Sequence, residues 1–255
     1  VIAASLRIDS GLASMGDYSQ VGGGWKGPVG RKMAEETENA GYEVHDRRPM
    51  PPREWAVMRW FTDGAIRLGL SANAVSVLSV MFACLGAAAT IATASTTGVP
   101  QRLLWLAGAI GIELRAFCNL LDGMVAVKTQ TASPVGELYN EVPDRLSDIA
   151  MLVGLGYAAG SSPTLGWAAA TAAVLVAYVR AQAAASGAGQ DYCGPMAKPM
   201  RMQLVAIGCL FMALKPENQT PNHLDGILFV ILAGSVITVV RRLWRAAARL
   251  REGAA

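Results

Sequence analysis

Histidine, cysteine and charge are all scarce in this chain. It contains two histidines and four cysteines among 255 residues, and 16% of its residues are charged. No two cysteines have the spacing of a metal-binding pair, and His45 lies far from His223 in the sequence. The composition therefore does not favour a zinc site or a disulfide framework. Hydrophobic residues make up 53% of the chain, which raises the expectation of a membrane protein.

Six long apolar stretches recur along the chain. They cover residues 73–95, 103–121, 146–163, 165–185, 202–214 and 224–240. A helix needs about 20 residues to cross ~30 Å of hydrocarbon, and several of these stretches reach that length, although the fifth is short. The pattern predicts an all-α, polytopic membrane protein with six transmembrane helices.

Basic residues alternate with the apolar stretches. They cluster before the first stretch, after the last, and in the second and fourth loops (Arg31, Lys32, Arg47, Arg48, Arg53, Arg59, Arg67; Arg241, Arg242, Arg245, Arg249, Arg251; Lys128; Lys198, Arg201). This distribution predicts that both termini and the even-numbered loops face the cytoplasm of the cell (inner) membrane. The net charge of +3 then comes from basic residues that lie beside anionic lipid at the cytoplasmic surface, and nucleic acid is not an expected partner.

The regions outside the six stretches differ in character. The predicted organisation is a partly disordered cytoplasmic segment over 1–52, an interfacial amphipathic helix over 53–70, a six-helix catalytic domain over 71–245 and a basic tail over 246–255. Residues 53–70 mix tryptophans with arginines, as interfacial helices do, although an extension of the first span explains them equally well. Ser71 is the expected N-cap of the first span. No signal peptide is expected, because Arg7 and Asp9 interrupt the first apolar residues.

Charged and amide side chains gather in and near the second and third apolar stretches. They are Glu113, Arg115, Asn119, Asp122, Asn140, Glu141, Asp144, Arg145 and Asp148, with Arg180 late in the fourth stretch. Charges within membrane spans are costly, so this cluster predicts a functional site at the cytoplasmic side. An alternative is that the charges only neutralise one another, for example Asp144 with Arg145, or Asp148 with Arg180.

Helical spacing places the polar side chains on two faces. Asn119, Asp122 and Ala126 share one face of a helix, and Gly136, Asn140, Asp144 and Asp148 share one face of the next. Two helices joined by a short hairpin would direct these oxygen atoms toward each other. Oxygen ligands without histidine or cysteine favour a hard cation such as Mg²⁺ or Mn²⁺.

The same residues resemble a known family signature. The stretch NLLDGMVAVKTQTASPVGELYNEVPD, residues 119–144, resembles the CDP-alcohol phosphotransferase signature D-x2-D-G-x2-A-R-x8-G-x3-D-x3-D. The matching residues are Asp122, Gly123, Ala126, Gly136 and Asp144. Asn119 and Asn140 replace the first and third aspartates, and Val127 replaces the arginine. The likeness extends over about residues 55–245.

This resemblance implies an activity and a set of site residues. The implied reaction transfers a phosphatidyl group from CDP-diacylglycerol to a polar alcohol and releases CMP. The four motif positions, Asn119, Asp122, Asn140 and Asp144, would hold Mg²⁺ or Mn²⁺, and Asp144 would accept the proton. Nucleotide binding falls to Asp122, Gly123, Ala126 and Gly136. Membrane lipid and a second copy of the chain, as a homodimer, are the implied partners.

Several residues extend this hypothesis beyond the motif. Arg180, Lys198 and Arg201 are candidates for binding the acceptor, with Lys128 as a further cation, and Asp148 is a possible compensating acid. If Arg180 binds phosphate, the acceptor is a phosphorylated alcohol such as glycerol phosphate or inositol phosphate. Two alternatives remain from the sequence: a non-catalytic relative that binds lipid or nucleotide, suggested by the two asparagines, and a transporter with an acidic site.

Overall fold

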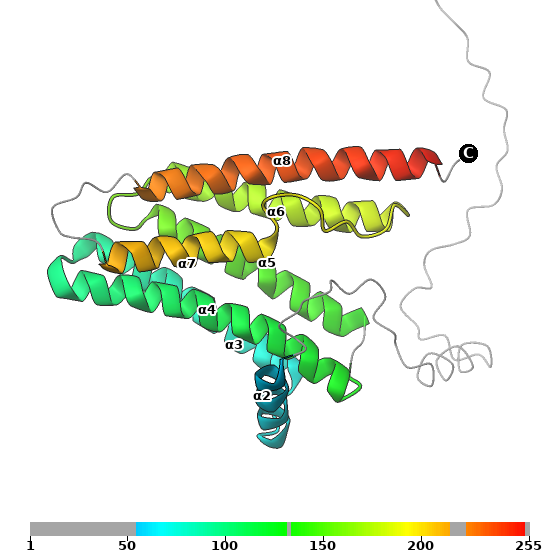
Figure 1. Ribbon diagram of the computed structural model, residues 1–255, viewed down its shortest axis with the longest axis horizontal. Helices are drawn as coiled ribbons and strands as arrows, with labels where there is room; N and C mark the ends of the chain where they lie inside the picture. The colour runs from blue at the N-terminus through cyan, green and yellow to red at the C-terminus, as the bar shows by residue number, and fades with distance from the viewer. Residues whose placement is uncertain (1–54, 132–133, 215–222, 253–255) are drawn as a thin grey trace, which may run out of the picture. The chain divides into compact units, whose positions relative to one another are not determined.

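The computed structural model describes residues 55–131, 134–214 and 223–252, which form helices joined by loops (Figure 1). The helices are α2 (Ala56–Arg67), α3 (Ala72–Ala92), α4 (Gly98–Lys128), α5 (Pro134–Gly156), α6 (Pro163–Ala185), α7 (Lys198–Leu214) and α8 (His223–Glu252), with a short 3-10 turn, η3 (Thr93–Ser95), after α3. These described ranges contain no strand, which agrees with the predicted all-α class. The predicted segment 1–52 lies outside them.

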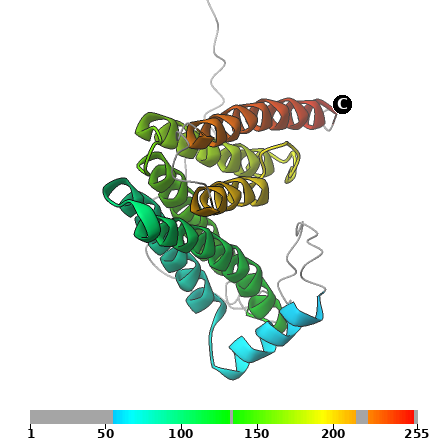
Figure 2. The same ribbon diagram turned by 60° about the vertical axis from the view of Figure 1, so that its left-hand side comes forward.

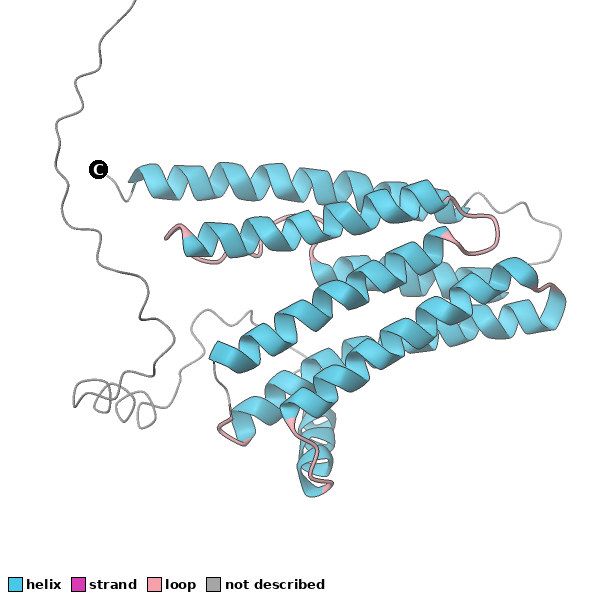
Figure 3. Cartoon of the chain, turned by 180° about the vertical axis from the view of Figure 1, so that it is seen from behind, coloured by secondary structure: helices cyan, strands magenta, loops and turns pink. Residues whose placement is uncertain are grey.

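The six helices from α3 to α8 form a bundle of three layers. Helix α3 packs along α4, and α6 packs along α8 (Figure 1). Helix α5 contacts both α3 and α6, and α7 contacts both α4 and α8, so α5 and α7 lie between the two outer pairs (Figure 3). This arrangement brings the C-terminal part of α4, the N-terminal part of α5 and the first turn of α7 to one end of the bundle.

Small residues allow neighbouring helices to approach closely. A Cβ atom added at Gly111 of α4 would lie 2.8 Å from the Gly86 Cα atom of α3. A Cβ atom at Gly156 of α5 would lie 2.8 Å from the Gly166 Cα atom of α6. Both contacts are backbone to backbone, so only glycine fits at these positions without a shift of the helices. This is the packing expected of membrane helices, which associate through small residues.

Helix α2 crosses the end of the bundle beside α4 (Figure 2). Its buried face is formed by Met58, Thr62 and Ala65, whereas Trp60 on the opposite face is 69% exposed. The helix therefore has the amphipathic character predicted for residues 53–70, although it occupies only Ala56–Arg67 within the described part. Its position at a membrane interface stays a prediction.

Four helices are long and apolar enough to cross a membrane. These are α3 with η3, α4, α6 and α8, counted within the described ranges. Helix α5 contains several charged residues, among them Glu141, Asp144 and Asp148, and α7 has 17 residues. Length and composition thus support an integral membrane protein, whereas six crossings remain a prediction. Ser71 is confirmed as the N-cap of α3, since its hydroxyl accepts a hydrogen bond from the Ala74 N–H.

The ends of several helices differ from the predicted spans. Helix α4 continues to Lys128 instead of ending near residue 121, so Lys128 belongs to the helix and not to the loop. Helix α7 begins at Lys198, so Lys198 and Arg201 also lie on a helix. The predicted boundaries were wrong because they follow hydropathy, whereas polar residues lie in the last turn of α4 and the first turn of α7.

Candidate active site

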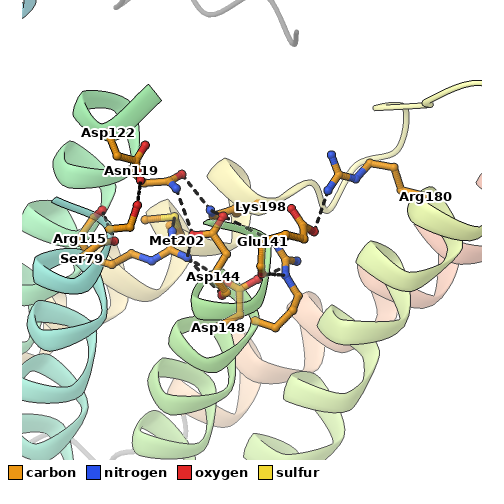
Figure 4. A network of polar contacts seen from close by, with 12 residues as sticks. Ser79, Arg115, Asn119, Asp122, Glu141, Asp144, Asp148, Arg180, Lys198 and Met202 are labelled. Carbon is orange, nitrogen blue, oxygen red and sulfur yellow. Dashed lines mark hydrogen bonds and ion pairs between the residues drawn. The ribbon is translucent and has the colours of Figure 1, made fainter. Parts of the chain in front are cut away.

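The motif residues of α4 and α5 meet at a buried polar centre (Figure 4). The Asn119 side-chain amide of α4 donates a hydrogen bond to Asp144 Oδ1 of α5, at 3.0 Å. The spacing argument therefore predicted correctly that the two faces point toward each other. Asp144 is 8% exposed, so the contact lies largely out of solvent.

Lys198 of α7 completes this contact. Its ammonium donates a hydrogen bond to Asn119 Oδ1 at 2.8 Å and forms an ion pair with Asp144 Oδ2. The lysine side chain is 18% exposed. One ammonium thus contacts the first and the last of the four motif positions at once, one residue on each of two helices.

Asp122 is held separately on the other side of Asn119. The Ser76 hydroxyl of α3 donates to Asp122 Oδ2 at 2.9 Å, and the Gly123 N–H donates to Oδ1 at 2.5 Å. Asp122 is 3% exposed and no cation pairs with it among the contacts of the described residues. Its charge is therefore stabilised by neutral donors, which leaves it suited to a ligand cation.

An arginine cluster lies beneath the motif residues. Arg115 of α4 is fully buried, and its Nη2 atom contacts Asp144 Oδ1 at 3.2 Å and Asp148 Oδ1 at 3.3 Å. Arg201 Nη2 contacts Asp148 Oδ2 at 2.8 Å, and Arg145 Nη1 contacts the same oxygen at 3.5 Å. Arginines therefore bind both oxygens of Asp148, the predicted compensating acid. Its contacts are those of a residue that stabilises the fold by pairing with buried arginines.

The predicted acceptor-binding cations do not form one group. Arg201 donates to the Met196 carbonyl oxygen as well as to Asp148 and is 3% exposed, so it belongs to the arginine cluster. Lys198 belongs to the motif centre. Arg180 stands apart, where its Nη2 atom contacts Glu141 Oε1 at 2.8 Å.

Arg180 is more exposed than Arg201, with side-chain exposures of 21% and 4%. Its Nη1 atom donates to the Gln190 side chain at 3.2 Å, and its guanidinium lies 5.5 Å from the centre of the Tyr192 ring. The expected pair of Asp148 with Arg180 is therefore wrong, whereas the expected contact of Asp144 with Arg145 occurs, at 3.8 Å. Lys128 pairs with Asp63 of α2, away from the motif centre.

Two residues of the site were missed as participants. Arg115 was interpreted from the sequence only as a charge within a span. Arg115, Asn119 and Asp122 occupy positions i, i+4 and i+7 of α4, so they share one face of that helix. That spacing could have identified it. Ser76 lies on a different helix from the motif, and no sequence pattern pointed to it. The half-buried Gly123, Ala126 and Gly136 lie on the motif helices as predicted.

In the family that the signature resembles, four aspartates bind divalent metal, and the first and third are the positions expected to bridge two ions. No group of three or more His, Cys, Asp and Glu side chains in the described residues is arranged to hold a metal ion. The four motif positions retain two carboxylates, Asp122 and Asp144, and Lys198 neutralises one of them. These residues do not fit two divalent cations. The side chains of Asp122, Asn140 and Asp144 carry oxygen atoms of the kind that one hard cation prefers.

Comparison with known proteins gives the family. The profile of the CDP-alcohol phosphatidyltransferase family matches residues 70–241. A phosphatidylinositol phosphate synthase of Mycolicibacterium smegmatis is 30% identical over 185 residues, which are 70% of this chain and 78% of that protein.

Solved structures give the same fold. A crystal structure of the Mycobacterium tuberculosis phosphatidylinositol phosphate synthase with CDP-DAG bound has a TM-score of 0.63 at 22% identity, covering 75% of this chain and 94% of that one. A second structure of that enzyme, in complex with manganese and citrate, has a TM-score of 0.63 at 23% identity, covering 74% of this chain and 88% of that one. Because the family profile spans most of the sequence, the chain belongs to the CDP-alcohol phosphatidyltransferase family and is a transferase of that type.

Proposed function

We propose that the protein transfers the phosphatidyl group of CDP-diacylglycerol to a phosphorylated polar alcohol, with inositol phosphate as the first candidate, and releases CMP. The observation that carries this proposal is the meeting of Asn119 and Asp144 across α4 and α5, because it brings the first and last positions of the family motif together at a buried centre. The similarity to phosphatidylinositol phosphate synthases supports the choice of acceptor.

The reaction breaks the phosphoanhydride bond of CDP-diacylglycerol and forms a phosphoester bond to the acceptor. The acceptor hydroxyl oxygen attacks the phosphorus that carries the diacylglycerol, a new P–O bond forms, and the bond to the CMP phosphate breaks so that CMP leaves with the electron pair. Asp144 is the proposed acceptor of the hydroxyl proton, a role that carboxylates fill in general base catalysis. Asp122, Gly123, Ala126 and Gly136 are the proposed nucleotide-binding residues.

The pyrophosphate must be neutralised for this exchange to proceed. Asp122, Asn140 and Asp144 are the proposed ligands of one Mg²⁺ or Mn²⁺ ion, which when bound would offset phosphate charge. Lys198 adds a fixed positive charge at the same centre. The chain's own residues thus hold the donor, orient the hydroxyl and take up its proton.

Arg180 is the proposed binding residue for the acceptor phosphate. Its partner Glu141 is 42% exposed, and the guanidinium is 21% exposed. A phosphate can therefore replace Glu141 without the penalty of opening a buried ion pair, and arginine binds phosphate in a bidentate manner. Arg201 lacks this freedom, because its partners are buried.

The orientation and assembly are also proposed. The basic C-terminal part of α8 lies near the 186–197 loop that leads to Lys198, since Arg245 and Arg249 both pair with Asp191. The motif centre and this basic end therefore belong to one side of the bundle, which supports a cytoplasmic site and cytoplasmic termini. A homodimer follows from the family resemblance alone, and the mass of the detergent-solubilised protein would test it.

An acceptor panel tests the proposed reaction. Purified protein would be incubated with CDP-diacylglycerol, Mn²⁺ and matched pairs of polyols and their phosphates, and the lipid products identified by mass spectrometry. We expect a phosphatidylinositol phosphate product and an equal amount of CMP. If no acceptor yields CMP while the protein still binds CDP-diacylglycerol, the non-catalytic alternative, to which the two asparagines point, replaces this proposal.

A further inference from the structure

The position of the Lys198 ammonium is unusual for this kind of site. It contacts Asn119 Oδ1 and Asp144 Oδ2, the side-chain oxygens of two positions at which the family signature has aspartates. A cationic group therefore lies where a positive metal ion would draw the same two oxygens together. The lysine comes from α7, outside the motif, so no motif position accounts for it.

The charge at the motif positions agrees with this placement. Asn119 and Asn140 are neutral, so Asp122 and Asp144 contribute two negative charges, and Lys198 contributes one positive charge. A net charge of −1 cannot balance two divalent cations, whereas four aspartates can. The two asparagines also remove the carboxylates that would bridge a pair of ions. Each loss weakens the attraction for a second dication.

The surrounding structure holds Lys198 in place. The Met196 N–H donates a hydrogen bond to the Thr238 hydroxyl of α8, at 3.0 Å, and Arg201 Nη1 donates to the Met196 carbonyl oxygen, at 2.9 Å. Gly194, just before, has a φ of +117°, a conformation that favours glycine. The segment that delivers the ammonium is thus fixed on both sides, as a built-in charge requires.

We propose that Lys198 takes the place of one divalent cation, so that this site binds at most one metal ion where the family signature implies two. Asn119 and Lys198 then act as a matched pair, in which a neutral amide oxygen and a tethered ammonium replace a carboxylate and a dication. This inference deepens the proposed function, since it concerns how the same site neutralises the pyrophosphate.

Metal stoichiometry tests the inference independently of catalysis. Mn²⁺ alone would be titrated into the full-length protein in detergent, without substrate, and bound ion counted by electron paramagnetic resonance and calorimetry. We expect at most one Mn²⁺ per chain at the motif centre. The triple variant Asn119→Asp, Asn140→Asp, Lys198→Met should bind two, and Lys198→Arg, which keeps the charge, should bind no more than the wild type.

Lys128→Met is the matched control. Lys128 is also a lysine at the end of a bundle helix, but it pairs with the exposed Asp63 and should leave the Mn²⁺ stoichiometry unchanged. Two Mn²⁺ ions on the wild-type motif centre, or no gain of an ion in a folded triple variant, would overturn the inference. Because substrate is absent, either result leaves the proposed transfer reaction to be judged by the acceptor panel.

Discussion

Arg115 and Asp148 form an ion pair from which solvent is excluded on both sides. Their closest atoms, Nη2 and Oδ1, are 3.3 Å apart, and the two side chains are 0% and 2% exposed. Arg115 also contacts Asp144, so this pair connects the buried arginine cluster with the proposed proton acceptor. The pair therefore helps to hold Asp144 in position. Removing either Arg115 or Asp148 alone would leave the other as a buried charge with one partner fewer.

Replacing Asp148 by leucine should strongly destabilise the protein. Arg201 would lose its buried carboxylate and Arg115 would lose one of two, and breaking a buried pair from one side costs about 3–5 kcal/mol. Thermal unfolding in detergent measures the loss. Asp63→Leu is the control, because the pair of Asp63 with Lys128 is exposed and such pairs contribute about 0–1 kcal/mol. Equal unfolding temperatures for the two variants would contradict the structural part assigned to Asp148.

Replacing Gly111 by alanine should destabilise the contact of α3 with α4. The added Cβ atom would meet the Gly86 backbone at 2.8 Å, and overpacking of this kind costs about 1–3 kcal/mol. Gly226→Ala on α8 is the matched control, since a Cβ atom there meets nothing within 4 Å. That substitution should be neutral or stabilising by about 0.5–1 kcal/mol. A Gly111→Ala protein that unfolds at the wild-type temperature would refute the close helix approach.

Replacing Arg180 by glutamine should weaken binding of a phosphorylated acceptor. Loss of a charged hydrogen bond to phosphate should raise the KM for inositol phosphate about tenfold or more, while the KM for CDP-diacylglycerol stays constant. Arg241→Gln, at an exposed arginine of α8, should change neither constant. An Arg180→Gln enzyme with an unchanged acceptor KM would remove Arg180 from the acceptor site.

Local sequence patterns predicted much of the site. The i, i+3 and i+4 spacing on α4 and α5 correctly placed Asn119 and Asp144 on facing surfaces, because helical periodicity fixes which side chains share a face. The apolar stretches located α3 and α6 closely, since hydrophobic length is a local property, whereas α4 and α8 continue well beyond the predicted residues 121 and 240, to Lys128 and Glu252. Hydrophobic length did not predict that the polar residues Lys128 and Lys198 belong to helices.

The contact of Lys198 with Asn119 could not be predicted in this way. These residues are 79 positions apart, and they meet only because α7 packs along α4. No periodicity within either helix encodes that packing, so Lys198 was interpreted as a loop cation that binds the acceptor. The same reason applies to Ser76, which reaches Asp122 across the contact of α3 with α4.

The release of CMP by an Asp144→Asn variant is the decisive measurement for the transferase assignment. Purified wild type, Asp144→Asn and the control Glu113→Gln, which alters an exposed carboxylate of α4, would be supplied with CDP-diacylglycerol, Mn²⁺ and inositol phosphate. Wild type and control should release CMP together with an equal amount of new lipid. Asp144→Asn, still folded by its thermal unfolding curve, should be slower by a factor of about 10² or more. Wild-type rates from folded Asp144→Asn protein would contradict a transfer reaction centred on this carboxylate.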